Sequence, residues 1–455
     1  MAKKTVSRGR GTGSPDDVLR KTLNNIKPSG DMQKAAATVV EGLRQPARKA
    51  GLDVEFMIGG SVAKGTDLEG DADVDVFARF SPKKHAGDDL SELLARILPK
   101  DAERVHGSRD YFQFRRKLAT EKGTGEGAKG KRTSAVDVLF EVVPVLRITD
   151  PTQAKNVTDM SPLHVGYVLA AIAKRPGLAD EIRLAKRFCK AAKCYGAESY
   201  INGFSGHVID LLILKHGSFQ ELLAAAAKWK GQVVIDLSGR KDALLAIDKS
   251  KRQGPLVLVD PVQPGRNAAA ALSQEKLDLF REAAKAWLKR PEQAFFDVVV
   301  SSEQTVTGWF EWERKKNRFG AKPRLFLIRT DAADGKDDIV ATKLKMAHEY
   351  LLRQAALQGF EPLGQGWEYD RKKRSGLHWL VFADETLPAT REFDGPPLRA
   401  TKDVTAFRKK HRDAREKDGR LVATVQRKFR TPEEFLKAAL KDPYVKGRMK
   451  KARLR

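Results

Sequence analysis

Ile58-Gly59-Gly60-Ser61 opens the stretch of sequence that decides the fold, and Asp71-Ala72-Asp73-Val74-Asp75-Val76-Phe77 closes it. The pattern predicts a strand ending near Ile58, a Gly-Gly-Ser turn, a short helix, and a second strand with alternating carboxylates. Because successive side chains of a strand point to opposite faces, Asp73 and Asp75 share one face of that second strand.

The composition of this stretch indicates a site for a metal ion and phosphates. Two carboxylates on one face repel each other unless a cation lies between them. Mg²⁺ suits that place, because it prefers oxygen ligands and usually keeps phosphate oxygens in its shell. Gly60 lets the backbone approach a phosphate closely, Ser61 offers a hydroxyl donor, and the start of the predicted helix favours an anion.

The glycine turn and the paired carboxylates, with Asp73 twelve residues after Ser61, resemble the signature of the polymerase-beta nucleotidyltransferase superfamily. A Gly-Ser or an Asp-x-Asp alone would more simply be a surface turn. Both together at this spacing favour a catalytic site.

A third carboxylate is expected on a neighbouring strand, and the β-branched segment from Ala135 to Pro144 offers two. Asp137 and Glu141 are four residues apart, so both can face the same side of the sheet, but about 13 Å separates them along the strand. Only one of the two can therefore complete the metal site, and the residue pattern alone leaves both open.

The composition points to a basic globular protein that binds nucleic acid. The chain has 455 residues, 41% hydrophobic and 32% charged, with a net charge of +26 and a pI near 9.9. This length predicts three or four domains. The charge attracts polyanions without distinguishing RNA from DNA. No apolar run approaches the roughly 20 residues that would span a membrane. The two cysteines, Cys189 and Cys194, are too few for a metal cluster and fit a reducing cytoplasm.

Helical periodicity predicts a helix over Asp31–Ala50 and another over Leu178–Tyr195, the second closed by Gly196. From Phe295 to Glu385 the pattern becomes strand, strand, helix, strand, with the helix at about Ile339–Gln358. An α+β domain of ferredoxin-like type is plausible there.

Further motifs in the right order resemble one family, the archaeal-type (class I) CCA-adding enzymes, which are tRNA nucleotidyltransferases. They cover nearly the whole chain: Ser161-Pro162-Leu163-His164, Arg183 to Phe188, Tyr195 to Glu198, Gly203 to Gly206, His216 to Phe219, Asp260-Pro261-Val262 with Arg266-Asn267, Leu387 to Arg391, and Gly395-Pro396-Pro397.

The resemblance implies an α+β, multidomain architecture. It comprises a polymerase-beta-like nucleotidyltransferase head at 1–148, a helical neck at 149–257, and a ferredoxin-like, tRNA-binding tail at 293–393. An α+β body is formed by 258–292 and by 394–455 with its basic C-terminal tail. The implied reaction is the addition of C, C and A to the 3′ end of tRNA from CTP and ATP, with Mg²⁺ and release of pyrophosphate. The family also implies contacts to the acceptor and T arms, a homodimer and a cytoplasmic location.

Matching by position, the resemblance implies that Asp73, Asp75 and Glu141 bind the metals. Glu141 is preferred over Asp137 because it precedes Val142-Val143-Pro144, although the family commonly has Asp there and Glu at position 73. The implied nucleotide contacts are Gly60, Ser61, Lys64, Ser161, His164, Lys186, Tyr195 and Arg266. Lys64 replaces a family Arg and so loses bidentate phosphate contact, and Ser161 replaces a Thr.

Taken singly, most of these residues have simpler explanations. His164 would cap a helix or be partly buried, Lys186 would be a solvated lysine, and Tyr195 a packed aromatic. Two other functions also fit the active-site signature. One is another template-independent nucleotidyltransferase, such as an RNA-tailing enzyme or a nucleotide-messenger synthase. The other is a catalytically idle RNA-binding protein.

Overall fold

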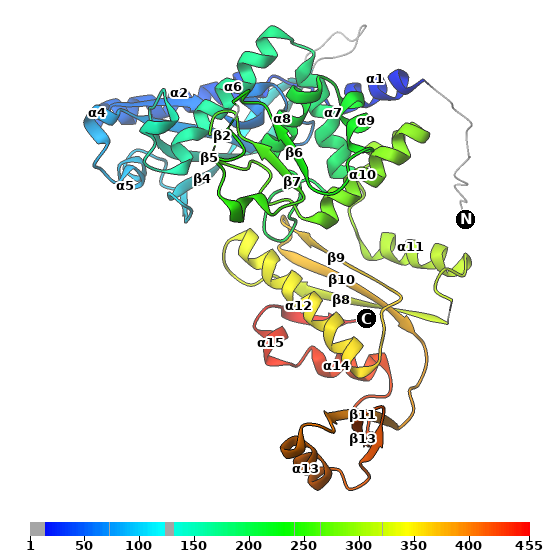
Figure 1. The fold of residues 1–455 in the computed structure, drawn as a ribbon. Helices are drawn as coiled ribbons and strands as arrows, with labels where there is room; N and C mark the ends of the chain where they lie inside the picture. The colour runs from blue at the N-terminus through cyan, green and yellow to red at the C-terminus, as the bar shows by residue number, and fades with distance from the viewer. Residues whose placement is uncertain (1–13, 72, 123–131, 241, 264, 321) are drawn as a thin grey trace. The chain divides into compact units, whose positions relative to one another are not determined.

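The computed structural model describes the chain except residues 1–13, 72, 123–131, 241, 264 and 321 (Figure 1). The chain divides into two compact units, residues 1–299 and 300–455. The α+β, multidomain class predicted from the sequence is confirmed. No helix in the described part of the chain has the length and apolar character needed to cross a membrane.

The first unit contains a mixed five-stranded sheet in the order β1-β2-β5-β4-β3. Its strands are β1 (Val54–Ile58), β2 (Asp73–Phe80), β3 (Glu103–Val105), β4 (Tyr111–Lys122) and β5 (Arg132–Leu146). Strands β2 and β5 are parallel, and the other neighbours are antiparallel.

The two faces of this sheet have different coverings. On one face, alternate residues such as Val74 and Val76 of β2 and Phe140 of β5 pack with the apolar side of α2 (Met32–Lys49). On the other face, Phe77 packs with Val165 of α6 (Ser161–Lys174). Because side chains alternate along a strand, Asp73 and Asp75 lie on the face of Phe77.

The remaining elements around the head sheet are short. They are α3 (Gly60–Lys64), α4 (Pro82–His85), α5 (Leu90–Ala95), and the 3₁₀ helices η1 (Pro151–Gln153) and η2 (Val157–Met160). The helix predicted from Asp31 to Ala50 is α2, with the Asp31 carboxylate accepting the Lys34 N–H at 2.9 Å as its N-cap.

A second group of elements in this unit shares one core. They are α1 (Pro15–Ile26), α7 (Leu178–Ala191), α8 (Gly206–His216), α9 (Phe219–Ala226), α10 (Gln274–Lys289), the parallel pair β6 (Val233–Asp236) and β7 (Leu256–Val259), and η4 (Gln293–Phe296). The 3₁₀ helix η3 (Lys249–Arg252), between β6 and β7, has no buried residue. Phe188, Phe219, Phe280 and Trp287 pack at the centre of the core.

The C-terminal end of the helix predicted over Leu178–Tyr195 is wrong. Helix α7 stops at Ala191, because Lys193 adopts a positive φ of 55° and breaks the helical path. Tyr195 then forms a bridge with Phe204. Tyr195 therefore lies outside the helix that carries Lys186.

The second unit contains a four-stranded antiparallel sheet in the order β14-β8-β10-β9. Its elements follow as β8 (Pro323–Asp331), α12 (Asp337–Gln358), β9 (Gly364–Asp370), β10 (Ser375–Ala383), α14 (Pro432–Ala439), α15 (Pro443–Lys446) and β14 (Lys450–Leu454). This is the βαββαβ order of a ferredoxin-like fold, the fold type that the sequence predicted. The predicted order of strand, strand, helix, strand over Phe295 to Glu385 is wrong, because the first segment is the helix α11 (Glu303–Lys315), whose buried residues Val306 and Phe310 are four apart, and two strands follow α12. The last strand of this fold comes from the segment predicted to belong to the body, and the predicted domain limits remain predictions.

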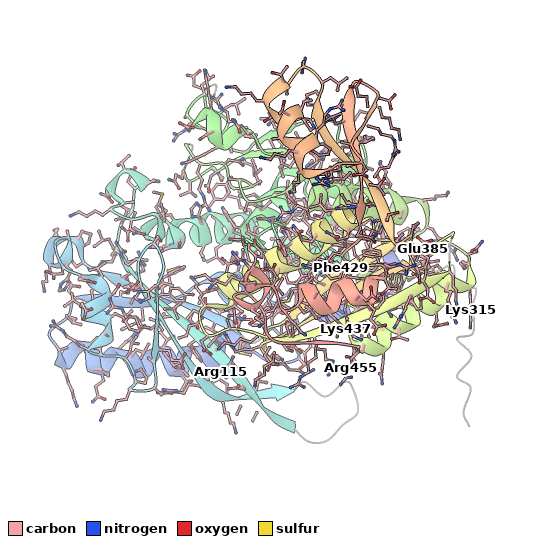
Figure 2. All side chains as sticks on the ribbon, turned by 90° about the horizontal axis from the view of Figure 1, so that it is seen from below. Arg115, Lys315, Glu385, Phe429, Lys437 and Arg455 are labelled. Atoms are coloured by element: carbon pink, nitrogen blue, oxygen red, sulfur yellow. The ribbon has the colours of Figure 1, made fainter. Side chains whose placement is uncertain are left out.

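Helices of the second unit pack on this sheet, and a small subdomain is inserted into it. Phe429 packs edge-on against Phe435 of α14, while Lys437 of the same helix is exposed and pairs with Glu433 at 2.6 Å (Figure 2). A separate helix, α11, precedes β8. The insertion lies between β10 and α14. The inserted elements are β11 (Thr390–Pro397), α13 (Thr401–Lys410), β12 (Arg415–Lys417) and β13 (Arg420–Gln426).

Candidate active site

The Gly-Gly-Ser turn lies directly against the second carboxylate of β2. The Gly59 N–H donates to the Asp75 carbonyl at 2.8 Å. Gly60 has a φ of 59°, and a Cβ atom there would come within 1.7 Å of Asp75 Oδ2. Only glycine fits this position, so the turn and the carboxylate are packed as one unit. Ser61 follows as the second residue of α3.

Three of the predicted carboxylates lie on one face of the sheet. Parallel pairing sets Asp75 of β2 directly opposite Glu141 of β5, with Asp73 two residues before Asp75. The Gln113 side-chain amide of β4 donates to Glu141. Burial raises the pKa of the Asp75 carboxyl, with Lys64 opposing the rise and Asp73 adding to it.

Asp137 lies away from this group. It is paired in register with Lys117 of β4, and its carboxylate accepts from Arg115 at 3.2 Å. Its side chain is 56% exposed. The structure therefore brings Glu141, and not Asp137, beside Asp75.

The two predicted phosphate-binding lysines lie in one buried cluster. Lys64 of α3 forms an ion pair with Asp210 of α8, with 9% and 0% of their side chains exposed. Lys186 of α7 is also buried, and its Nζ donates to Thr66 O at 3.1 Å and to Thr66 Oγ1 at 2.9 Å. Burial lowers the pKa of Lys186 to about 8, and Asp210 opposes this shift.

Tyr195 borders the same cluster. A Cβ atom on Gly206, at the start of α8, would lie 3.2 Å from the Tyr195 hydroxyl and 3.8 Å from Lys186 Cε. Burial raises the pKa of Tyr195, so the hydroxyl keeps its proton and can donate it in a hydrogen bond. Lys190 lies 5.2 Å from the centre of the Tyr195 ring and pairs with Asp71 at 2.7 Å.

Two of the three remaining predicted nucleotide contacts, His164 and Arg266, meet at Asp260, which follows β7. His164 Nε2 lies 2.9 Å from Asp260 Oδ2, and Arg266 donates to the same oxygen at 3.2 Å. The Asp260 carboxylate also accepts the backbone N–H groups of Val262 and Gln263. Burial raises the pKa of Asp260, but the hydrogen bonds and charge interactions with His164 and His207 together outweigh burial and lower this pKa, so the carboxyl stays ionised.

A metal ion is one ligand that this second cluster could hold. Ligand atoms of His164, His207 and Asp260 lie within 4.8 Å of one another. Burial lowers the pKa of His164, which leaves its ring neutral. The Arg266 guanidinium, however, already brings a positive charge to Asp260. The cluster therefore suits an anionic or polar ligand better than a cation.

Ser161 begins α6, three residues before His164, with η2 immediately ahead of it.

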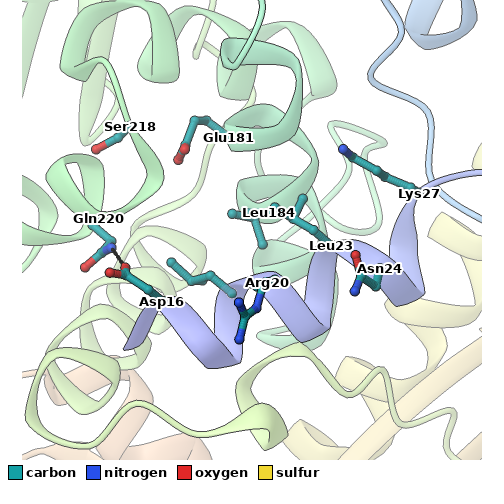
Figure 3. Close-up of a pocket in the computed structure, with 10 residues that line it drawn as sticks. Asp16, Arg20, Leu23, Asn24, Lys27, Glu181, Leu184, Ser218 and Gln220 are labelled. Atoms are coloured by element: carbon teal, nitrogen blue, oxygen red, sulfur yellow. Dashed lines mark hydrogen bonds between the residues drawn. The ribbon is translucent and has the colours of Figure 1, made fainter. Parts of the chain in front are cut away.

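A separate surface pocket of about 390 Å³ lies between α1 and the helices α7 and α9, where Gln220 donates to Asp16 at 3.0 Å (Figure 3). None of the predicted site residues lines this pocket.

Sequence reasoning assigned no role to Asp210, Thr66 or His207, and it used Asp260 only as part of a motif. One signal was available for Asp210. It is the single charged residue in the apolar run from Val208 to Leu214, and a buried carboxylate needs a partner. No local pattern pointed to Thr66.

The chain is similar to known proteins along most of its length. Residues 180–297 match the family described as tRNA nucleotidyltransferase, second domain, and residues 323–449 match CCA-adding enzyme, C-terminal domain. The CCA-adding enzyme of Methanopyrus kandleri is 31% identical, with 93% of this chain and 86% of that protein covered. The CCA-adding enzyme of Nanoarchaeum equitans is 30% identical, with 82% and 84% covered. That of Methanothermobacter thermautotrophicus is 28% identical, with 92% and 87% covered.

Solved structures resemble part of the chain at low sequence identity. The Cid1 poly(U) polymerase with bound magnesium and 3′-dATP has a TM-score of 0.47 and 13% identity, covering 62% of this chain and 98% of its own. The ATP complex of CdnC from E. coli MS115-1 has a TM-score of 0.42 and 18% identity, covering 62% and 94%.

Proposed function

The chain belongs to the CCA-adding enzymes, and we propose that it performs its nucleotidyl transfer at Asp73, Asp75 and Glu141. As a CCA tRNA nucleotidyltransferase it extends the 3′ end of tRNA. In the proposed step, the 3′ oxygen of the RNA forms a bond to the α-phosphorus of CTP or ATP. The bond from that phosphorus to the bridging oxygen breaks, pyrophosphate leaves, and the hydroxyl proton passes to solvent.

The carboxylate group fits Mg²⁺. Asp75 is buried beside Asp73 and opposite Glu141, and this crowding of acidic groups is relieved by a cation. Bound Mg²⁺ would lower the pKa of the attacking hydroxyl and neutralise charge on the leaving oxygens. The three residues would hold the metal, and the side chain of Gln113 fixes Glu141 from the next strand.

The triphosphate would lie beside the Gly60-Ser61 turn, within reach of Lys64, Lys186 and Tyr195. The buried position of both ammonium groups supports this, since a positive charge acts more strongly on phosphate where water is excluded. Ser161 and His164 would add further contacts to the triphosphate, and Arg266 would contact the incoming base and the RNA phosphates, with Asp260 orienting His164 and Arg266.

The nucleic-acid partner would be held through its backbone. The net charge of +26 supports contacts to many phosphates. We assign the acceptor and T arms of tRNA to this interaction, because the A-form helix is read through shape and backbone rather than base edges. A homodimer is proposed on family grounds. A cytoplasmic location is supported by the two free, buried cysteines.

The single observation that carries the catalytic assignment is the register that sets Asp75 opposite Glu141, with Gly60 against Asp75. The test uses a tRNA transcript without its 3′ CCA, Mg²⁺, and CTP alone, ATP alone, or both. We expect growth by two residues with CTP and by three with both. A long ladder with ATP alone would indicate RNA tailing, and no growth would refute the function.

A variant links that result to the site. Asp73→Asn should abolish addition while tRNA binding, measured by filter retention, changes less than twofold. Turnover at the wild-type rate in this variant would refute the metal assignment.

A further inference from the structure

Asp210 has no role in the reaction as described so far, yet it is a fully buried charge beside the predicted phosphate-binding lysines. It lies on α8, where Val208, Ile209, Leu211 and Leu212 are all buried with it. A carboxylate in such surroundings is costly unless cations or hydrogen bonds compensate it. Its exposed fraction is 0%, so solvent supplies no compensation.

The compensation comes from the lysines proposed to bind the triphosphate. Lys64 pairs with Asp210 Oδ2 from a different element, the short helix α3 after the Gly-Gly-Ser turn. Lys186 of α7 also lies against α8, since a Cβ atom on Gly206, one turn before Asp210, would lie 3.8 Å from Lys186 Cε. The charge of Asp210 raises the pKa of that ammonium group against the effect of burial. One carboxylate thus faces cations from both α3 and α7.

The second oxygen of Asp210 has an unusual environment. Asp210 Oδ1 is buried and has no hydrogen-bond partner among the residues that the structure describes. Lys186 uses two N–H groups on Thr66, one on the carbonyl and one on the hydroxyl. A carboxylate kept only for stability would normally have both oxygens satisfied.

We propose that Asp210 is a positioning residue, the shared counter-ion that holds Lys64 and Lys186 where the triphosphate tail of CTP or ATP binds. This inference rests on the proposed function of that site. Without the carboxylate, two neighbouring buried ammonium groups would repel each other and Lys64 would lose its anchor. Asp210 touches no phosphate itself and acts through the lysines.

The proposal predicts an effect that depends on the number of phosphates. The lysines that Asp210 holds would contact the triphosphate tail. Loss of Asp210 would disorder these lysines, so the affinity for CTP should fall while the affinity for CMP stays nearly unchanged. A purely structural role of Asp210 would affect both nucleotides alike. The ratio of the two dissociation constants therefore separates positioning from stability.

The experiment measures the dissociation constants of CTP and CMP by calorimetry, on the full chain with Mg²⁺ and without tRNA. Asp210→Asn should raise the dissociation constant of CTP by roughly tenfold or more, the size expected for the loss of a charge-assisted contact. The dissociation constant of CMP should rise by less than twofold. Equal weakening of both, or unchanged CTP binding, would overturn the proposal. Asp53→Asn is the matched control, because Asp53 pairs with Arg147 and Lys84 at the other end of β1.

Two further variants keep the test decisive. If Asp210→Asn does not fold, Asp210→Glu keeps the charge and should still favour CTP over CMP, whereas loss of that preference would count against the specific anchor geometry. In a background where both lysines are replaced, Lys64→Met with Lys186→Met, Asp210→Asn should add less than twofold to the loss of CTP affinity, because neither of the groups it positions is present. Independent, multiplying losses would overturn the shared role.

The same variants separate this inference from the proposed function. If Lys64→Met itself leaves CTP binding unchanged, the triphosphate site is wrongly assigned and the proposal falls with it. If Lys64→Met weakens CTP but Asp210→Asn does not, only the role of Asp210 is refuted.

Discussion

Replacing Lys186 by methionine should change the way in which stability depends on pH. Lys186 is 3% exposed, and burial lowers its pKa from the ordinary 10.5 to about 8. At about 1.4 kcal/mol for each pKa unit, this shift amounts to about 3 kcal/mol. That is the cost of holding the protonated lysine in its site.

The sign follows from proton uptake on unfolding. Between pH 8 and 10.5 the unfolded chain binds the proton and the folded chain does not, so wild-type stability rises with pH in this window. Below pH 8 both states are protonated and the whole cost remains. The Lys186→Met variant lacks this proton, so wild type should gain up to about 3 kcal/mol relative to it between pH 8 and 10.5.

At neutral pH the variant avoids the cost of burying the ammonium charge. It also leaves Thr66 without the hydrogen-bond donor of Lys186, and this loss offsets about 1 to 3 kcal/mol of the gain in unfolding free energy. We therefore expect Lys186→Met to be at least as stable as wild type at pH 7 and much less active in nucleotide addition.

The assay is urea unfolding of both proteins in parallel at pH 7, 8, 9 and 10, followed by circular dichroism. Taking the difference between the two proteins cancels the titration of groups they share. A difference in unfolding free energy that stays constant from pH 7 to pH 10 would refute the assigned burial of the charge. Wild-type addition should also fall as pH rises through about 8, because neutral Lys186 no longer attracts phosphate.

Four other predictions address separate parts of the molecule. Glu141→Gln should lower the rate of addition by about 100-fold or more, and Asp137→Asn should leave it nearly unchanged; equal effects would show that the third carboxylate is wrongly chosen. Asp260→Asn should release Arg266 and alter the ratio of CTP to ATP incorporation in single-turnover assays, a result that an unchanged ratio would contradict. Binding of tRNA should weaken by about 1,000-fold between 50 and 200 mM salt if six or more phosphates are contacted, and a flat response would exclude a backbone interface. Deleting residues 450–455 removes β14, so thermal scans should show a less stable second unit while the dissociation constant of CTP stays the same.

Local patterns in the sequence were sufficient for much of the fold. Alternation along β2 gave the face of Asp73 and Asp75, and the predicted helix over Asp31–Ala50 agrees with α2 to within one residue at each end. The ferredoxin-like fold type of the second unit was also predicted, but its element order was not, since α11 occupies a segment predicted as a strand and two strands follow α12. These features depend on neighbours in the chain, which periodicity and capping rules describe well.

Contacts between distant segments could not be predicted in this way. Lys64 and Asp210 are 146 residues apart, and His164 and Asp260 are 96 apart, so no local pattern pairs them. The choice between Asp137 and Glu141 likewise needed the register of β2 on β5, which the two strands separately leave open. The end of α7 was misjudged because a positive φ at Lys193, a residue without a strong turn preference, could not be anticipated.

The pairing of β14 with β8 also sets the order of events during synthesis on the ribosome. β8 ends at Asp331 and β14 begins at Lys450, so at about 5 to 20 residues per second roughly 6 to 24 s pass between them. Residues 1–299 can fold before that interval ends. In the meantime the growing chain carries β8 with one edge unpaired. This interval is when nascent copies on one messenger RNA are most exposed to pairing with each other instead of with their own last strand.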